Sequence, residues 1–460
     1  MKFTPEPYQI KAEHHVIDNP RCGLGLDMGL GKTVTTLNAF QVLKYEMGAV
    51  QSMVVVAPLS VALLTWRQEI KKWDHLQHLV VRLLHGNDKD EQLRLPADIY
   101  LINYEGLQWL KDRLANKKIQ FPQRIDMVVF DESTRIKNKT AVCSQISQAL
   151  SFGVERAVIL SGSPTPNSLL DIWHQIYVLD AGERLGKAYT KFRAENFIND
   201  GEARKWFPRR GVSDRIARNI EDIFLTMRSE DYLDLPPRIV HDVPVLLPDK
   251  YRKMYDELES KFILDLGNTE ITALSASSLS MKLRQFVQGF VYDEEKQPHA
   301  VHKEKLEALR DIVNNTGSNI LVAVQFRHEY EMIREYFKKD FEVPVIRGGI
   351  SSAEKADIML RWNNGQIPLL VGNAESVSLG LNMQFGGNII VWYSLLWNYG
   401  TYIQFNKRIH RKQQTKPVYI YRLIMDDTID EVMKAVLNSK GAMMTKLLDA
   451  VIELRERRTL

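Results

Sequence analysis

Short runs of apolar, mostly β-branched residues recur along the first 180 residues, separated by more polar segments. The runs show little polar alternation, which is typical of strands buried on both faces of a parallel sheet, and several intervening segments are compatible with helices. The runs lie at residues 22–26, 53–57, 79–84, 99–102, 126–130 and 156–160. This pattern predicts an α/β domain over residues 1–180.

A second series of apolar runs predicts another α/β domain over residues 301–435. These runs lie at residues 319–324, 342–346, 369–372, 388–392 and 418–423. The stretch 181–300 lacks such a series, and its pattern favours helical insertions and a connection between the two domains. Residues 436–460 are expected to form a C-terminal helix with a break near Gly441. The predicted fold is α/β, with two parallel-sheet lobes and helical insertions between and beside them.

Composition excludes several classes of protein. The 460 residues are 45% hydrophobic and 26% charged, which is typical of globular domains. The net charge of +4 is too small to indicate nucleic acid or a membrane surface, so any basic site must be local. No apolar run reaches the roughly 20 residues needed to cross a bilayer. With two cysteines and no visible export signal, we expect a cytoplasmic protein without a disulfide framework.

The segment at residues 27–33, DMGLGKT, has the pattern of a phosphate-binding loop. It follows the first predicted strand and precedes a helix-compatible segment, which is the context such a loop requires. Gly29 and Gly31 would let backbone N–H groups turn toward a polyphosphate. Lys32 would neutralise the β- and γ-phosphate charge, and the Thr33 hydroxyl would ligate Mg²⁺. The sequence therefore predicts ATP and Mg²⁺ as cofactors.

Two acidic residues follow the apolar run at 126–130. A nucleotide site of this kind needs a carboxylate that orders Mg²⁺ and a group that orients water, at the end of a neighbouring strand. We expect Asp131 to hold the metal and Glu132 to orient and deprotonate the attacking water. Leu26 stands where the strict phosphate-loop pattern has glycine, but the strand-to-helix context outweighs this departure. The two motifs together predict a nucleoside triphosphatase.

Two arginines in the second lobe are candidates for contacting the γ-phosphate. Arg408 and Arg411 are three residues apart, so they would share one face of a helix. An arginine in that role accelerates hydrolysis by about 10³–10⁵ in well-studied switches. Taken alone, such a basic helix is more often a solvated face, and it is the neighbouring motifs that favour the catalytic interpretation.

Taken in chain order, these segments resemble the Swi/Snf-type branch of superfamily 2 helicase-like ATPases, which are DNA translocases. The resemblance covers nearly the whole chain. It rests on Tyr8-Gln9, DMGLGKT at 27–33, VVVAPLSVALLTWRQEIKKW at 54–73, DESTRIKN at 131–138, SGSPTPN at 161–167, MRSEDYLDLPPR at 227–238, HKEKLEAL at 302–309, ESVSLGLNMQ at 375–384, Trp397-Asn398 and the arginine motif.

The resemblance implies two RecA-like lobes with ATP bound between them. Gln9 would contact adenine, while Gln404, Arg408 and Arg411 would complete the site from the second lobe. Gly380 and its neighbours would couple nucleotide to DNA. Alternating closure and opening of the lobes would then drive movement along the duplex.

Two departures from the family pattern change the expectation. The family usually has Ala-His after the acidic pair, where Ser133 and Thr134 stand here. That histidine helps to link hydrolysis to the Ser-Gly-Ser motif, so the shorter Thr134 implies weaker coupling. Gln413, preceded by Lys412, replaces a family glycine near the end of the arginine motif and alters the local turn. Since both arginines are intact, we still expect an active ATPase.

A local basic cluster is the candidate DNA surface. Between residues 203 and 219 a single acid, Asp214, accompanies six basic residues: Arg204, Lys205, Arg209, Arg210, Arg215 and Arg218. Such a run is usually a solvated face, but by resemblance insertions in this region lie beside the DNA. Trp397 is either a core residue or close to the DNA path. Trp66 and Trp73 are predicted to be packing residues.

The sequence thus predicts an ATP-driven motor that moves on double-stranded DNA in replication, recombination or repair. A strand-separating DNA or RNA helicase is one alternative, and a poorly hydrolysing, nucleotide-gated DNA-binding scaffold is another. No histone-reading, nuclease or zinc module is visible, which favours a bacterial or phage-infected cell. A protein partner is a candidate source of targeting.

Overall fold

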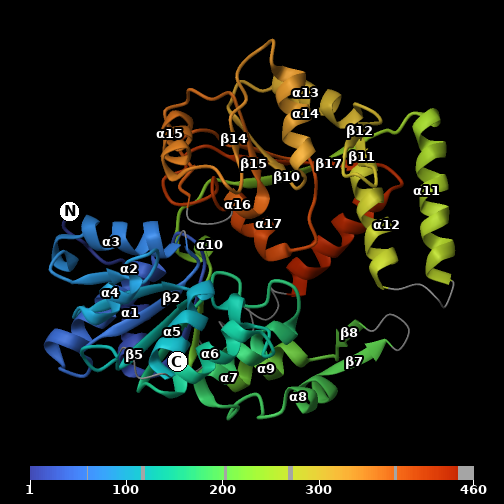
Figure 1. The fold of residues 1–460 in the computed structure, drawn as a ribbon. Coiled ribbons are helices and arrows are strands. Elements are labelled where there is room, and N and C mark those ends of the chain that lie inside the picture. Colours follow the sequence, from blue (N-terminus) through green and yellow to red (C-terminus); the bar gives the residue numbers. More distant parts are fainter. Residues whose placement is uncertain (60, 116–119, 201–204, 268–272, 378–380, 444–460) are drawn as a thin grey trace. The chain divides into compact units, whose positions relative to one another are not determined.

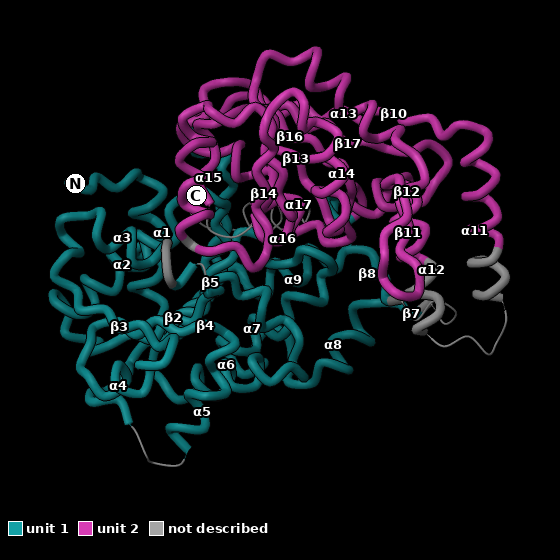
Figure 2. Tube along the Cα trace, turned by 45° about the horizontal axis from the view of Figure 1, so that its top comes forward, with its two compact units in different colours: residues 1–233, 440–460 teal, residues 234–439 magenta. Residues whose placement is uncertain are grey.

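The computed structural model describes residues 1–59, 61–115, 120–200, 205–267, 273–377 and 381–443. The chain divides into two compact units, Met1–Leu233 with Lys440–Leu460 and Asp234–Ser439 (Figures 1 and 2). Each unit contains one large sheet in which every described strand pair is parallel. The predicted fold class is therefore confirmed.

The first unit contains a seven-stranded sheet with the order β3-β4-β2-β5-β6-β1-β9. Its strands are β1 (Arg21–Leu26), β2 (Met53–Ala57), β3 (Val81–Leu83), β4 (Ile99–Asn103), β5 (Met127–Asp131), β6 (Arg156–Leu160) and β9 (Phe224–Met227). Because β6 lies between β1 and β5 and all three are parallel, the segments that follow them emerge side by side at one edge of the sheet.

Both faces of this sheet are buried, as the apolar runs predict. In β2, Val54 and Val56 belong to one hydrophobic core and Val55 and Ala57 to the other. Helices α1, α2 and α3 contribute to the second core, and α5, α6, α7 and α9 to the first. Alternate side chains of a strand point to opposite faces, so a continuous apolar run is what two covered faces require.

The helices of the first unit connect these strands and extend beyond them. They are α1 (Pro7–Asp18), α2 (Lys32–Gln41), α3 (Arg67–Lys72), α4 (Lys89–Arg94), α5 (Leu107–Ala115), α6 (Val142–Phe152), α7 (Ile172–Asp180), α8 (Tyr189–Asn196), α9 (Val212–Ile220) and α10 (Ser229–Tyr232). A short 3₁₀ turn, Ser133–Ile136, follows β5. An antiparallel hairpin of β7 (Phe197–Asp200) and β8 (Lys205–Pro208) lies between α8 and α9 (Figure 1).

The second unit has a six-stranded parallel sheet with the order β10-β17-β16-β13-β15-β14. Its strands are β10 (Arg238–Val245), β13 (Ile320–Val324), β14 (Val345–Ile346), β15 (Leu369–Asn373), β16 (Ile389–Trp392) and β17 (Val418–Met425). A separate antiparallel pair is formed by β11 (Phe290–Tyr292) and β12 (Pro298–Ala300). This sheet also divides two cores, since Ala323 belongs to one and Val322 and Val324 to the other.

Helices cover both faces of the second sheet. They are α11 (Asp249–Gly267), α12 (Ala273–Phe286), α13 (Glu304–Asn315), α14 (Arg327–Phe337), α15 (Ser352–Asn363), α16 (Ala374–Val377) and α17 (Tyr399–Asn406). Residues of α15 and α17 pack into one core, and residues of α13 and α14 into the other.

The stretch 181–300, interpreted from sequence as helical insertions, is divided between the two units and contains strands as well as helices. In the first sheet β9 pairs with β1, and in the second β10 pairs with β17. Both are edge strands, and edge strands need no long apolar run. The four residues of β9 are too few to form a recognisable pattern, and β10 is largely exposed.

The predicted C-terminal helix is present in part. Residues 429–443 are helical and continue through Gly441 without the expected break. The remainder of the predicted segment, from residue 444 onward, lies outside the described residues.

The second unit contains a buried carboxylate whose protonation is linked to stability. Glu329 is fully buried on α14, where Oε2 accepts hydrogen bonds from the backbone N–H groups of Gln325 and Phe326 and from the Ser394 hydroxyl. Burial raises the pKa of Glu329 to about 7, against the lowering effect of these three donors. The folded chain therefore keeps a proton that the unfolded chain releases at lower pH.

We expect the second unit to lose stability as the pH rises from about 4.5 to 7. Over this range the unfolded chain releases the Glu329 proton, whereas the folded chain keeps it or holds a charged carboxylate in the core. The corresponding change in unfolding free energy is about 3 kcal/mol. Glu329→Gln should remove this part of the pH dependence and raise stability at pH 8. Denaturant unfolding of both proteins at pH 5, 6, 7 and 8 measures it, and parallel pH profiles would contradict the expectation.

Candidate active site

The phosphate loop turns sharply between β1 and α2. Gly29 and Gly31 have φ values of +93° and +79°, and α2 begins at Lys32, directly after Gly31. The conformation favours glycine there, and a Cβ atom on Gly31 would lie 2.5 Å from Nε2 of Gln9, so it would displace that side chain. Leu26 departs from the strict pattern because it is the last residue of β1 and is buried in the core.

Lys32 and Thr33 occupy the first turn of α2, where a helix N-terminus favours anions. Lys32 Nζ donates a hydrogen bond to the Leu26 carbonyl (2.6 Å), and its charge also acts on Asp131. Thr33 is 9% exposed. The structure therefore brings the lysine and hydroxyl of the phosphate loop to the same edge of the sheet as the acidic pair.

Gln9, the predicted adenine contact, lies on α1 and packs against this loop. Its Nε2 donates to the Leu30 carbonyl (3.3 Å), and its Oε1 accepts from the backbone N–H of Glu6 (3.0 Å). These two bonds fix the side chain beside Gly31.

Asp131 is the last residue of β5 and is held by donors from distant segments. Its Oδ2 accepts from the Trp66 indole N–H (2.9 Å), and its Oδ1 accepts from the Glu132 backbone N–H (2.9 Å). The Tyr104 hydroxyl donates to its backbone carbonyl (2.8 Å). Burial raises the pKa of Asp131, while the Trp66 hydrogen bond and the Lys32 charge act in the opposite direction.

Trp66 and Tyr104 were not predicted to belong to this site. Trp66 is fully buried, as its interpretation as a packing residue requires, and in addition orients a carboxylate. No sequence signal distinguishes a tryptophan that only packs from one whose N–H also finds a partner. Trp66 and Tyr104 come close to Asp131 only when the chain folds.

Glu132 has a strained backbone. Its φ of +53° and ψ of +54° are left-handed, which costs a residue with a side chain about 1–2 kcal/mol. Such strain persists only where the surroundings fix the conformation, and it is frequent at functional sites. The 3₁₀ turn Ser133–Ile136 begins immediately after Glu132, and the side chain is partly exposed.

The side chains present fit a hard divalent cation bound together with nucleotide phosphates. Mg²⁺ prefers oxygen ligands and is commonly held by one or two carboxylates or hydroxyls, phosphates and water. Thr33 and Asp131 supply such oxygens at one edge of the sheet. When bound, Mg²⁺ neutralises phosphate charge and supports transfer of the γ-phosphoryl group to water.

In the second unit, the two predicted arginines do not lie on a helix. Helix α17 carries Gln404 and ends at Asn406, and the chain continues in turns through Arg408 and Arg411. The assumption that a helix face aligns them was therefore wrong, since a spacing of three residues is equally compatible with successive turns. The backbone N–H of Arg411 bonds to the Ile409 carbonyl (3.1 Å).

Both arginines instead contact the same neighbouring segment. Arg408 is 5% exposed, and its Nη1 donates to the Leu381 carbonyl (3.1 Å). The half-buried Arg411 donates from Nη1 to Asn382 Oδ1. The arginine motif thus packs against the end of the predicted ESVSLGLNMQ segment. Gly380 of that segment lies outside the described residues.

Gln413 has a φ of +78°, a conformation that favours glycine. This explains why a glycine suits the position in the family pattern. The strain stays local, because the Gln414 backbone N–H still bonds to the Arg411 carbonyl (3.0 Å).

The candidate DNA residues are placed in different surroundings. Arg204 and the side chain of Lys205 lie outside the described residues, and Arg209 and Arg210 are exposed beyond β8. Arg215 on α9 donates to Asn196 Oδ1, and Arg218 donates to the Asp214 carbonyl. Trp397 is partly buried and packs against a core of the second unit, which favours the core interpretation.

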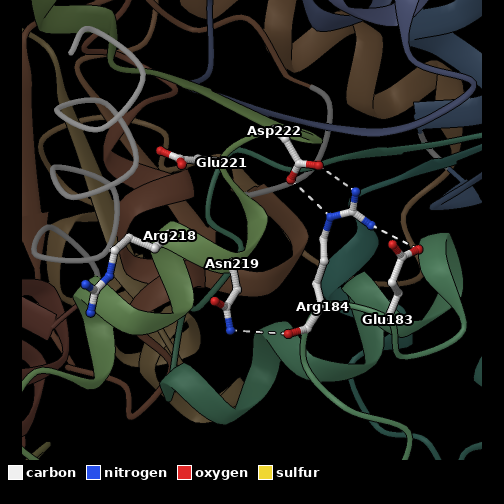
Figure 3. Close-up of a pocket in the computed structure, with 6 residues that line it drawn as sticks. All are labelled: Glu183, Arg184, Arg218, Asn219, Glu221 and Asp222. Atoms are coloured by element: carbon white, nitrogen blue, oxygen red, sulfur yellow. Dashed lines mark hydrogen bonds and ion pairs between the residues drawn. The ribbon is translucent and has the colours of Figure 1, made fainter. Parts of the chain in front are cut away.

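A pocket of about 420 Å³ lies beside α9 in the first unit (Figure 3). Arg184 donates to both carboxylate oxygens of Asp222 (3.0 and 2.5 Å) and also contacts Glu183. Asn219 Nδ2 donates to the Arg184 carbonyl (3.2 Å). Arg184 is thus paired with carboxylates, whereas Arg218, which also lines the pocket, belongs to the basic cluster of residues 203–219.

Comparison with known proteins identifies the family. The SNF2-related domain family matches residues 15–290, which is more than half of the chain. The chain belongs to the SNF2-related family. The helicase conserved C-terminal domain family matches residues 304–413. The predicted Swi/Snf-type branch and the enzyme class, an ATPase of helicase superfamily 2, are therefore confirmed.

Individual relatives of this SNF2-related chain differ in length. The p41 protein of Acyrthosiphon pisum secondary endosymbiont phage 1 is 34% identical, over 98% of this chain and 99% of its own length. An uncharacterized ATP-dependent helicase of Mycoplasma genitalium is 24% identical over 94% of this chain, which spans only 40% of that helicase. The SWI2/SNF2 ATPase core of Sulfolobus solfataricus, solved with double-stranded DNA, aligns at 24% identity with a TM-score of 0.45, covering 96% of this chain and 92% of that one.

Among the described residues, every helix is too short or too polar to serve as a membrane span.

Proposed function

We propose that this SNF2-related ATPase is a motor that is stimulated by DNA and moves along the duplex. The observation that carries the proposal is the order β5-β6-β1 within a parallel sheet. It brings the phosphate loop, the segment after β6 and the acidic pair together at one edge, with Lys32 acting electrostatically on Asp131. ATP hydrolysis is the chemistry for which these groups are suited.

Each predicted site residue has a role in this proposal. Lys32 neutralises the β- and γ-phosphates, Thr33 and Asp131 hold Mg²⁺, and Glu132 orients the attacking water. Gln9 contacts adenine, and backbone N–H groups near Gly29 and Gly31 bind phosphate oxygens. From the second unit, Gln404, Arg408 and Arg411 contribute to hydrolysis, and Gly380 and its neighbours link it to DNA.

The Trp66 hydrogen bond makes a specific prediction about Mg²⁺. Trp66→Phe keeps an aromatic ring but removes the N–H that fixes Asp131 Oδ2, so the Mg²⁺ concentration for half-maximal hydrolysis should rise about tenfold. Trp73→Phe is the matched control, because Trp73 donates to Glu69 and not to the acidic pair. An unchanged Mg²⁺ titration for Trp66→Phe would show that this bond does not order the metal carboxylate.

For DNA, the proposal rests on the family and on the exposed pair Arg209 and Arg210. The Mycoplasma relative is named an ATP-dependent helicase, and motors of this kind grip nucleic acid through phosphates. A role in replication, recombination or repair in the cytoplasm is part of the proposal, and the phage relative of nearly equal length supports a bacterial or phage-infected cell as its setting. A separate protein partner for targeting is part of the proposal.

Removing the two arginines tests the DNA surface. Arg209→Ala/Arg210→Ala should weaken duplex binding at every sequence. The decrease of log affinity with log salt should become less steep by about 2, because about 0.9 counterion is released for each phosphate contact. ATP hydrolysis without DNA should be unchanged. Lys338→Ala/Lys339→Ala, which removes the same charge from the turn after α14, is the control. An equal effect of both double variants would mean that only net charge matters.

A further inference from the structure

A buried glutamine joins two segments of the candidate site. Gln175 lies on α7, and its Oε1 accepts a hydrogen bond from the Ser133 hydroxyl (2.7 Å). Its Nε2 donates to the Pro164 carbonyl (2.7 Å) and to the Asp171 carbonyl (2.7 Å). Ser133 and Gln175 are both 0% exposed. A continuous hydrogen-bonded path therefore runs from the turn after the acidic pair to the segment after β6.

The Gln175 amide can take only one orientation. An amide has one oxygen that accepts and two N–H hydrogens that donate, and here all are used. Reversing the amide would turn Oε1 toward the carbonyl oxygens of Pro164 and Asp171, leaving three acceptors without a hydrogen between them. The bridge thus fixes the distance between its two ends.

Both ends of the bridge lie at the phosphate site. Ser133 is the second residue after Asp131. Pro164 lies two residues after Gly162. A Cβ atom added to Gly162 would lie 3.5 Å from Lys32 Nζ and 3.7 Å from the Leu26 carbonyl. The segment 161–164 therefore lies against the phosphate lysine and is tied through Gln175 to the acidic pair.

The bridge also explains how the strained backbone of Glu132 is maintained. On one side of Glu132, the Asp131 carbonyl is bound by Tyr104, and on the other side Ser133 is bound by Gln175. The turn is fixed at its far end as well, because His174 Nδ1 donates to the Ile136 carbonyl (2.5 Å). Helix α7 thus holds both ends of the turn that follows the left-handed residue.

We propose that Gln175 is a positioning residue for ATP hydrolysis, holding Glu132 in its left-handed conformation through Ser133 and coupling it to the segment 161–164. The inference rests on the proposed function, because it assigns Glu132 the role of orienting water. The Gln175 bridge links the acidic pair to the Ser-Gly-Ser motif in this chain, where Thr134 is too short to supply the link. Gln175 itself touches no reacting atom.

The test compares three buried substitutions by kcat, KM for ATP and thermal unfolding. Gln175→Met removes the bridge while keeping a side chain of similar length, and Ser133→Ala removes one end of it. Both should lower kcat by about tenfold to a hundredfold, with KM changed less than about twofold, because a small misplacement of a group that orients water has effects of that size. Ser151→Ala should leave kcat unchanged. It loses an equally buried hydroxyl that bonds to the Val178 carbonyl of the same helix.

The double variant separates positioning from general packing. If Ser133 and Gln175 act as one unit, Ser133→Ala/Gln175→Met should be no slower than Gln175→Met alone. Wild-type kcat in both single variants, or losses that multiply in the double variant, would overturn the inference.

Lys32→Ala is the blank in every one of these measurements. If wild type does not exceed that blank, the proposed ATPase fails; if it does and Gln175→Met equals wild type, only the role of Gln175 fails.

Discussion

Lys32→Ala is expected to abolish ATP hydrolysis while leaving the protein folded. The ammonium group is the only lysine charge that the phosphate loop supplies to the β- and γ-phosphates, and without it the transferred phosphoryl group is not stabilised. Lys32 is half-buried, and its Nζ donates a hydrogen bond to the Leu26 carbonyl, so its truncation removes no core packing. Steady-state phosphate release, thermal unfolding and duplex binding measure the three expectations.

The matched control is Lys11→Ala, which removes an exposed lysine from α1, the helix that carries Gln9. Lys11→Ala should hydrolyse ATP as the wild type does. Retained DNA-stimulated turnover in Lys32→Ala would contradict the assignment of the phosphate loop, and loss of the thermal transition would show that Lys32 is needed for folding.

Arg411→Ala is expected to reduce turnover by about 10³ with little change in ATP affinity, because an arginine that contacts the γ-phosphate acts mainly in the transition state. Arg411 is half-buried and donates a hydrogen bond to the Asn382 side chain, so its loss should cost less stability than the loss of the more deeply buried Arg408. Single-turnover hydrolysis and binding of a fluorescent ATP analogue separate the two effects.

Arg408→Ala should reduce turnover similarly and also destabilise the second unit. Arg408 is nearly fully buried and bonds to the Leu381 carbonyl, so alanine leaves a buried acceptor and a space. Lys412→Ala is the control for charge, since Lys412 is exposed beside Arg411. Near-wild-type turnover in both arginine variants would remove both residues from the proposed mechanism.

The parts of the site that are contiguous in sequence could be predicted. Residues 27–33 form a local turn whose glycines, lysine and threonine each have a physical role, and Asp131 ends an apolar run. Parallel strands place their carboxyl ends at the same edge, so the two motifs could be expected to meet. The two parallel sheets then confirmed the fold class, and the family match confirmed the ATPase class.

Contacts that depend on distant segments could not be predicted. Trp66 and Tyr104 bond to Asp131, and Gln175 bonds to Ser133, from separate elements, and these partners are set only when the sheet assembles. Nothing in their local sequence distinguishes them from ordinary buried residues. The sequence pattern therefore gave the chemical groups of the site but not what holds them in place.

Local spacing and edge strands account for the remaining differences. Arginines three residues apart suit a helix, yet α17 ends at Asn406 before either of them. The strand β10 has arginine, histidine, aspartate and proline along it and is mostly exposed, so it lacks the apolar run of a central strand. In both cases tertiary pairing, not periodicity, decides the structure.

Steady-state ATP hydrolysis tests the central claim most directly. It should be measured at one fixed salt concentration without nucleic acid and with single-stranded DNA, double-stranded DNA or RNA, using Lys32→Ala as the blank, because phosphate contacts make every affinity depend on salt. A motor that moves on duplex DNA should be stimulated strongly by double-stranded DNA and weakly by the other two. Stimulation mainly by single strands or RNA would instead indicate a strand-separating helicase. Hydrolysis that no nucleic acid changes would contradict the proposed motor.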